Sequence, residues 1–188
     1  PAVAPTVDES RKKKALEFLN SIGRTVLTEY ESKRLLELYG VPVTRERLAA
    51  AEEEAVAAAE EIGYPVVLKI VSPDIAHKTE ADGVAIGIRD ADGVRSAFHR
   101  IIANAKNYKP DAEIHGVLVQ EQVSGGTEVI IGASRDDQFG LTLMFGMGGI
   151  FVEVFKDCVF RIPPLSAEEA KGMVQGIRGY PLLEGVRG

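Results

Sequence analysis

Several features are scarce or missing in this sequence, and each absence excludes a class of protein. One cysteine in 188 residues, Cys158, allows no internal disulfide and no cysteine-rich metal site. No run approaches the roughly 20 apolar residues that a membrane span needs. A net charge of −6, with one short basic cluster at 11–14, argues against a nucleic-acid surface, which needs clustered cations. The first ten residues lack the basic and apolar regions of a signal peptide, so we expect a cytoplasmic protein.

The common catalytic and nucleotide-binding motifs are also missing. The sequence has no GxxxxGK[ST] phosphate loop, no HExxH zinc motif, no GxSxG elbow and no EF-hand loop. These absences argue against a P-loop ATPase, a zinc protease and a serine hydrolase.

Helix and strand patterns alternate in the first half of the chain, and strand patterns cluster in the second. Helical patterns occupy residues 10–20, 28–40, 51–63, 92–108 and 166–179. Strand patterns occupy residues 41–44, 65–71, 83–90, 114–123, 127–136, 141–146 and 150–162. This order predicts an α+β fold with two lobes that meet near residue 110.

Lys69 interrupts the apolar strand pattern "PVVLKIV" at 65–71. A lysine there is costly to bury without a counter-charge. One interpretation is an edge strand whose lysine reaches solvent on its flexible stem. The other is an ammonium group that points into a cleft toward a polyphosphate. The strand alone does not choose between them, but the loop that follows favours the second.

That loop, "SPDIAHKTEADG" at 72–83, holds a histidine, a cation and a hydroxyl together. Lys78, Thr79 and the backbone at Gly83 can donate to a phosphate. His77 can act as a nucleophile through a ring nitrogen, because a fraction of ordinary histidine side chains is neutral at pH 7. The alternative is an ordinary surface loop, which is the commoner setting for a single histidine.

A third candidate lies in "VLVQEQVSGGTEVIIG" at 117–132. Glu121, Gln122 and Val123, at the end of a strand, can offer backbone groups to a purine edge, and the Glu121 carboxylate can accept from an exocyclic amine. Glu128 can accept from ribose hydroxyls. The alternative is a plain hairpin with solvated carboxylates.

A fourth candidate is the glycine-rich "MFGMGGIFVE" at 144–153. Gly146, Gly148 and Gly149 follow a strand pattern and allow close approach to a phosphate, another ligand or a partner backbone. The spacing is not GxGxxG, so it gives little support to a dinucleotide-binding fold.

Taken together, these stretches resemble the ATP-grasp subunit or domain of the ADP-forming acyl-CoA synthetases, which are relatives of succinyl-CoA synthetase. The matching residues run from about 25 to the end of the sequence and include "LYGVPV", "EIGYPVVLKIVSPDIAHKTEADGV", "LMFGMGGIFVEVFKDCVFRIPPLS" and "YPLLEGVRG". The resemblance implies an ATP-grasp fold with a nucleotide cleft between two α/β lobes. The expected division is an N-terminal tail and helix at 1–24, a first lobe at 25–110, and a second, C-terminally incomplete lobe at 111–188.

The resemblance also implies a reaction and roles for individual residues. The family reaction is acyl-CoA + ADP + phosphate ⇌ carboxylic acid + CoA + ATP, with the phosphoryl group carried on histidine. By resemblance, His77 is the phosphorylated histidine and Lys69 holds nucleotide phosphates. Residues 121–123 match the hinge that holds adenine, and Glu128 matches the acidic residue near ribose.

The same family suggests what this chain depends on. The resemblance implies that the protein binds ATP or ADP and Mg²⁺. The metal ligands are expected in a "D-x-N-P" segment and a later aspartate beyond residue 188, with none in this chain. The resemblance also implies a CoA-binding partner subunit or fused domain, so the chain is expected to act as an acid–CoA ligase only within a hetero-oligomer or a larger polypeptide.

Two alternatives to this function stay open at the level of sequence. The family usually has paired glycines where this chain has Asp82-Gly83, so a negative charge lies in the phosphate loop. A nucleotide-sensing or docking module that kept the fold and lost turnover would tolerate that change. An ATP-grasp ligase without a histidine relay is disfavoured by the position of His77.

Overall fold

The computed structural model describes residues 8–149 and 154–185, which form two compact units. The first unit runs from Asp8 to Ser124, and the second is built from residues that follow Ser124. The sequence suggested a division near residue 110. The strand at 116–121 instead hydrogen-bonds between two strands of the first unit, which places the division after Ser124.

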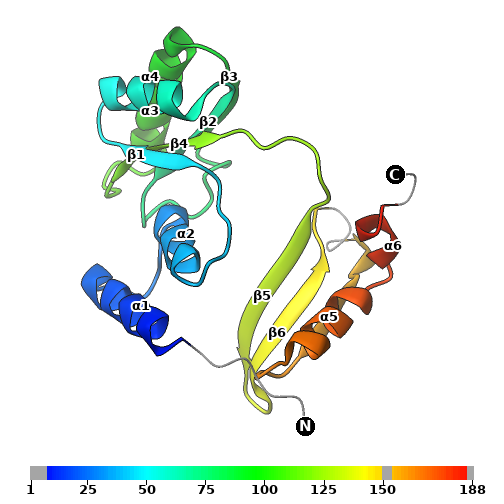
Figure 1. Cartoon of the computed structure of the whole chain (residues 1–188). Helices are drawn as coiled ribbons and strands as arrows, with labels where there is room; N and C mark the ends of the chain where they lie inside the picture. Colours follow the sequence, from blue (N-terminus) through cyan, green and yellow to red (C-terminus); the bar gives the residue numbers. More distant parts are fainter. Residues whose placement is uncertain (1–7, 150–153, 186–188) are drawn as a thin grey trace. The chain divides into compact units, whose positions relative to one another are not determined.

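The first unit consists of four helices and four strands among its described residues (Figure 1). In chain order these are α1 (Glu9–Ile22), α2 (Glu29–Leu38), β1 (Glu46–Ala49), α3 (Glu52–Ile62), β2 (Val66–Val71), β3 (Val84–Ile88), α4 (Ala91–Tyr108) and β4 (Gly116–Glu121). The strands form one antiparallel sheet in the order β1-β4-β2-β3.

The ends of two elements show how the sequence sets their limits. α2 begins with a capping box, in which Thr28 and Glu31 satisfy each other's backbone N–H groups. The strand expected at 41–44 is wrong, because the first strand starts at Glu46 and pairs with β4 from Gln120 to Val117. Pro42 lies in the expected segment and has no N–H to give to such a ladder.

The core of the first unit lies between the sheet and the pair α3 and α4, which cover one face of it (Figure 1). In β2, Val66, Leu68 and Ile70 point into this core and are fully buried. Side chains alternate along a strand, so Lys69 faces the opposite side of the sheet. That side carries α2, whose first turn lies over the strands (Figure 1).

The second unit consists of a three-stranded antiparallel sheet and two helices among its described residues. Its elements are β5 (Val129–Asp136), β6 (Gly140–Met147), β7 (Cys158–Arg161), α5 (Ala167–Gln175) and α6 (Tyr180–Leu183), with sheet order β5-β6-β7. Phe145 and Met147 of β6 pack with Met173 and Ile177 to form its small core. The last strand is shorter than the pattern at 150–162 indicates, and residues 150–153 lie outside the described part.

The predicted α+β class is confirmed, because both sheets are antiparallel and their helices are interspersed with the strands. The described residues include no helix with the length and apolar content to cross a bilayer.

Gly116 marks a close contact between β4 and β1 that a side chain would disrupt. Its φ is +140°, and an added Cβ would lie 2.4 Å from the Ala49 carbonyl oxygen. We expect Gly116→Ala to lower the free energy of unfolding by about 1–3 kcal/mol. The matched control is Gly172→Ala in α5, where a Cβ meets nothing within 4 Å. Denaturant titration followed by circular dichroism should show loss for the first variant only; equal stabilities would contradict the close contact.

Candidate functional site

Lys69 lies in an ion pair rather than in solvent. Its Nζ is 2.8 Å from Oε1 of Glu29, the first residue of α2, and its side chain is 23% exposed. The cost of placing a lysine in an apolar strand is therefore offset by a counter-charge that lies 40 residues earlier in the chain. The interpretation of Lys69 as a solvent-directed edge residue does not fit this contact.

Two further lysines contact the same carboxylate. Lys33 lies one helical turn after Glu29 and is 3.2 Å from Oε1, while Lys78 is 3.2 Å from Oε2. Lys33 also contacts Glu46 of β1 at 2.7 Å. Three ammonium groups thus share two carboxylates, which leaves one excess positive charge. We call these five residues the lysine–glutamate cluster.

The ionisation of Glu29 reflects these neighbours. Partial burial of its carboxyl group favours the neutral form and raises the pKa. The hydrogen bond from Lys69 and the charges of all three lysines outweigh that effect and lower the pKa from 4.5 to about 2. Glu29 is therefore a carboxylate at neutral pH.

The loop that carries His77 is anchored on both sides of the histidine. Ile75 and Ala81 are buried in the core of the first unit. Asp74 accepts hydrogen bonds from the Glu113 backbone N–H and from the Lys109 ammonium group. We call residues 72–83 the His77 segment.

Within this segment, His77 itself projects outward. Its side chain is 76% exposed, and its Nδ1 lies 4.0 Å from Oε1 of Glu80. The His77 carbonyl oxygen accepts from the backbone N–H groups of Glu80 and Ala81, so the turn fixes the backbone while the imidazole stays accessible. Lys78, the next residue, points back to Glu29, and Thr79 is exposed.

Asp82 and Gly83 close the segment for reasons that concern packing. Asp82 has a positive φ of 45°, a conformation that aspartate tolerates better than most residues. Its carboxylate accepts a hydrogen bond from the Asn104 amide on α4 at 2.8 Å. A Cβ at Gly83 would lie 2.6 Å from Cγ2 of Ile70, so glycine is needed there for contact with β2.

A small cavity lies between α2 and the start of the His77 segment. Its volume is about 180 Å³. Its lining is mainly apolar and also includes Thr28, Glu29 and Lys78. The lysine–glutamate cluster therefore borders a hollow next to the histidine.

The predicted hinge residues are largely engaged with the protein itself. The Glu121 carboxylate accepts from the Arg45 backbone N–H at 2.9 Å and from its Nε at 2.8 Å, contacts that lower the Glu121 pKa. The Gln122 side-chain oxygen accepts from the Gly87 N–H at 2.7 Å. Val123 is 67% exposed.

Glu128 and the predicted glycines belong to the second unit and lie together there. The Gly148 N–H donates to the Glu128 carbonyl oxygen at 2.7 Å, and a Cβ at Gly148 would lie 2.9 Å from Cβ of Glu128. Gly149 has a φ of +58° near the Glu128 carboxylate. A Cβ at Gly146 would lie 2.7 Å from the Asp157 carbonyl oxygen, so this glycine allows strands β6 and β7 to pair closely.

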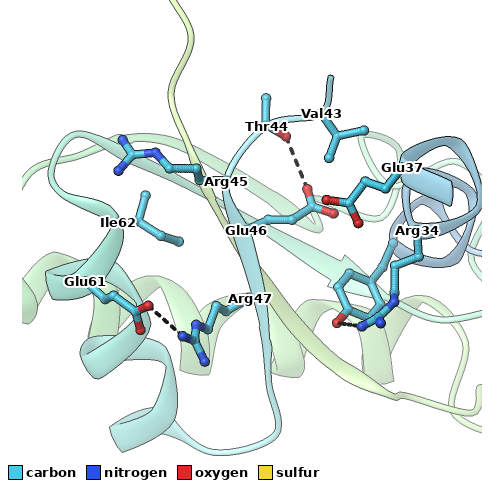
Figure 2. Close-up of a pocket in the computed structure, with 10 residues that line it drawn as sticks. Arg34, Glu37, Val43, Thr44, Arg45, Glu46, Arg47, Glu61 and Ile62 are labelled. Atoms are coloured by element: carbon cyan, nitrogen blue, oxygen red, sulfur yellow. Dashed lines mark hydrogen bonds and ion pairs between the residues drawn. The ribbon is translucent and has the colours of Figure 1, made fainter. Parts of the chain in front are cut away.

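The first unit also has a larger hollow of about 400 Å³ on α2, β1 and α3, shown in Figure 2. Several of its polar groups contact one another: Arg47 pairs with Glu61, and Glu46 accepts from the Thr44 hydroxyl (Figure 2). None of the predicted site residues lines it. The smaller cavity beside Lys78 is therefore the better candidate.

No group of three or more histidine, cysteine, aspartate or glutamate side chains in residues 8–149 and 154–185 is placed to hold a metal ion. The part of the chain that the structure describes therefore does not fit a Mg²⁺ site built from its own ligands.

Sequence analysis missed Glu29. An acidic residue directly after a helix cap is common, because it complements the helix dipole, and so Glu29 attracted no attention beside the Thr28–Glu31 capping box. The signal that could have found Glu29 is Lys69 itself, because a lysine in a strand buried on both sides requires an acidic partner elsewhere in the chain.

A family model described as an ATP-grasp domain matches residues 19–188. The β subunit of acetate–CoA ligase (ADP-forming) I from Pyrococcus furiosus is 52% identical over 162 residues, which are 86% of this chain and 70% of that protein. The 4-hydroxybutyrate–CoA ligase (ADP-forming) of Nitrosopumilus maritimus is 45% identical over 182 residues, which are 97% of this chain and 26% of that protein.

Solved structures of acetyl-coenzyme A synthetase 1 from Ca. Korarchaeum cryptofilum are also similar. The complex with coenzyme A, Ca-AMPCP and HgCl+ has a TM-score of 0.86 and 49% identity, and the match covers 94% of this chain and 77% of that one. A second complex contains coenzyme A and Mg-AMPPCP and is described as having its phosphohistidine segment pointing towards the nucleotide binding site. It has a TM-score of 0.76 and 45% identity over 94% of this chain and 75% of that one.

The lowered pKa of Glu29 predicts a specific dependence of stability on pH. A carboxyl group with a native pKa near 2 stabilises the fold fully above about pH 4.5, and this contribution is lost as the pH falls toward 2. Glu29→Gln should therefore lower the free energy of unfolding by about 1–3 kcal/mol at pH 7, because two lysines lose a charged hydrogen-bond partner.

Urea titrations of the parent and Glu29→Gln between pH 7 and pH 2 measure this difference. It should be constant down to about pH 5 and then shrink. Glu37→Gln, on the exposed face of the same helix, serves as the control and should match the parent throughout. A difference that grows on acidification would contradict the assignment.

Proposed function

The chain belongs to the ATP-grasp subunits and domains of the ADP-forming acyl-CoA synthetases, and from this premise we propose that it binds ATP or ADP and carries a phosphoryl group on His77. The family resemblance and the ATP-grasp fold expected from the sequence are confirmed. The proposed reaction of the complete enzyme is acyl-CoA + ADP + phosphate ⇌ carboxylic acid + CoA + ATP. Relatives named for this class of reaction include both a β subunit and a much longer chain.

The observation that carries the proposal is the setting of His77. An exposed imidazole lies on a segment whose backbone is anchored at Ile75 and Ala81, directly beside Lys78. Lys78 and Lys69 are held by one carboxylate at the base of that segment. A similar solved structure is described as having a phosphohistidine segment that points towards its nucleotide site.

The residues of this chain have distinct tasks in the proposed transfer. A neutral ring nitrogen of His77 forms a bond to the γ-phosphorus of ATP as the bond from that phosphorus to the ADP oxygen breaks. In the reverse direction ADP takes the group back. Lys69 and Lys78 neutralise phosphate charge, which such a reaction needs more than proton transfer. Mg²⁺ would supply further charge neutralisation when bound.

Adenine recognition by residues 121–123 is part of the proposal. The Arg45 side chain donates to the Glu121 carboxylate, and the Gly87 N–H donates to the side-chain oxygen of Gln122. These contacts favour recognition of the base by backbone groups near Gln122 and Val123 rather than by the Glu121 side chain. Glu128, in the second unit, remains the proposed partner of the ribose hydroxyls.

The setting of Asp82 bears on the alternative of a non-catalytic docking module. That alternative was allowed by the negative charge that Asp82 places beside the phosphate loop, and by the lack of the expected metal ligands in this chain. The Asp82 carboxylate instead accepts from Asn104, and the unusual backbone conformation is one that aspartate can adopt. The local structure therefore supports a working phosphate loop. A CoA-binding partner subunit or fused domain and a cytoplasmic location complete the proposal.

His77→Asn tests the relay directly. Asparagine keeps a polar side chain of similar position but cannot form a phosphoramidate. The complete enzyme, incubated with radiolabelled ATP and Mg²⁺, should lose its acid-labile, base-stable label and its acyl-CoA synthesis, while ATP affinity stays within a few-fold. His99→Asn, which changes an exposed histidine on α4, should label like the parent. Full acyl-CoA synthesis by His77→Asn would rule out the relay.

Lys69→Met tests phosphate binding. The variant keeps an apolar stem and removes the charge, so ATP affinity should fall at least tenfold, about 1.4 kcal/mol. The stability cost should stay within about 1 kcal/mol, because Glu29 keeps Lys33 and Lys78 as partners. Calorimetry with ATP and denaturant titration measure both quantities, with Lys106→Met on the exposed face of α4 as the control. Unchanged ATP affinity would show that Lys69 serves the fold alone.

A further inference from the structure

We infer that Glu29 is a positioning residue for phosphoryl transfer: it fixes the ammonium groups of Lys69 and Lys78 at the base of the His77 segment and so sets the rate of transfer rather than the affinity for nucleotide. The inference rests on the proposed function of His77. It assigns to α2 a part in the reaction, although α2 contributes none of the predicted nucleotide contacts.

The first step concerns how one carboxylate divides its oxygens. Oε1 of Glu29 accepts from Lys69 at 2.8 Å, and Oε2 contacts Lys78 at 3.2 Å. The two oxygens belong to one planar group, so a single carboxylate holds both ammonium groups close to itself. Lys69 comes from β2 and Lys78 from the loop that follows it. Glu29 is thus a bridge between a strand and the His77 segment.

The second step is that Glu29 itself is firmly held. It is the first residue of α2, directly after the buried cap Thr28, which is 7% exposed and bonded to Glu31. Arg24 adds three close contacts to the Glu31 carboxylate. Lys33, one turn further on, links Oε1 of Glu29 to β1 through Glu46. The Glu29 carboxylate, which contacts three lysines and lies in a capped helical turn, can therefore set the positions of its partners as well as their charge balance.

The third step connects this bridge to the histidine. Lys78 directly follows His77, and the segment is pinned at Ile75 and Ala81 on either side. The Lys78 side chain is 21% exposed, whereas that of His77 is 76% exposed. The Glu29–Lys78 contact therefore ties the residue next to the reacting group to α2.

The fourth step separates rate from affinity. Glu29 places a negative charge beside the two cations that are proposed to meet phosphate. Its removal leaves both lysines unpaired, which strengthens the attraction for a polyanion in the ground state. The same removal frees the lysines and the His77 segment from a fixed geometry, and in-line transfer depends strongly on geometry. The two effects have opposite signs, and a purely structural residue would not produce that combination.

The test compares Glu29→Gln, Glu29→Asp and Glu37→Gln in the complete enzyme with its CoA-binding partner. Two quantities are measured: the single-turnover rate of His77 phosphorylation at saturating ATP, and the dissociation constant for ATP. Glu29→Gln should phosphorylate at least tenfold more slowly and bind ATP as tightly as the parent or more tightly. Glu29→Asp keeps the charge and should recover part of the rate. Glu37→Gln, on the exposed face of α2, should match the parent.

Other results would overturn the inference. A parent-like phosphorylation rate in Glu29→Gln would do so, and so would weaker ATP binding with an unchanged saturated rate. If Glu29→Gln does not fold, the effect of Glu29→Asp on the phosphorylation rate is measured with and without Lys78→Met. The aspartate change should lower the rate little further once Lys78 has been replaced. An equal rate loss in the presence and absence of Lys78 would then reject the coupling. Absence of label on His77 in the parent would instead overturn the proposed function itself.

Discussion

The carboxylate of Glu29, surrounded by three ammonium groups, is the interaction on which the first unit depends. β2 has buried neighbours on both faces, and Lys69 is its single charged side chain. Without an acid nearby, that lysine would bear the full cost of desolvation. Glu29 offsets the cost and at the same time joins α2 to β2 and to the loop after β2. A single ion cluster therefore contributes to stability and assembles the groups that are proposed to meet phosphate.

The layers of the unit explain why the cluster lies where it does. α3 and α4 pack against one face of the sheet. The apolar core between them includes Leu68 and Ile70 of β2. The alternation of side chains along β2 then directs Lys69 to the other face, where α2 is the covering element. Gly83 lets the end of the His77 segment rest against Ile70, so the loop returns to the strand from which it left. The apolar core and the charged face are consequences of the same strand pattern.

Much of the fold could be predicted from the sequence, and the features that could not be predicted have a physical cause. The helical patterns at 28–40 and 166–179 begin at Thr28 and Ser166, and both residues are N-caps with capping boxes. The α+β class followed from the order of helix and strand patterns. The acid that pairs with Lys69 was not found, because 40 residues separate the partners and no local pattern links them. The division after Ser124 was likewise missed, since β4 joins the sheet by pairing between strands formed much earlier in the chain.

The location of Glu29 also bears on where the smallest working version of this domain begins. The sheet starts at Glu46, and a fragment cut at that point would retain Lys69, Lys78 and His77. It would lose their shared counter-ion, and the face that α2 covers would present unneutralised ammonium groups. The family match begins at residue 19, ahead of α2. α2 is thus an integral part of the first unit, and a boundary chosen at the edge of the sheet would remove it.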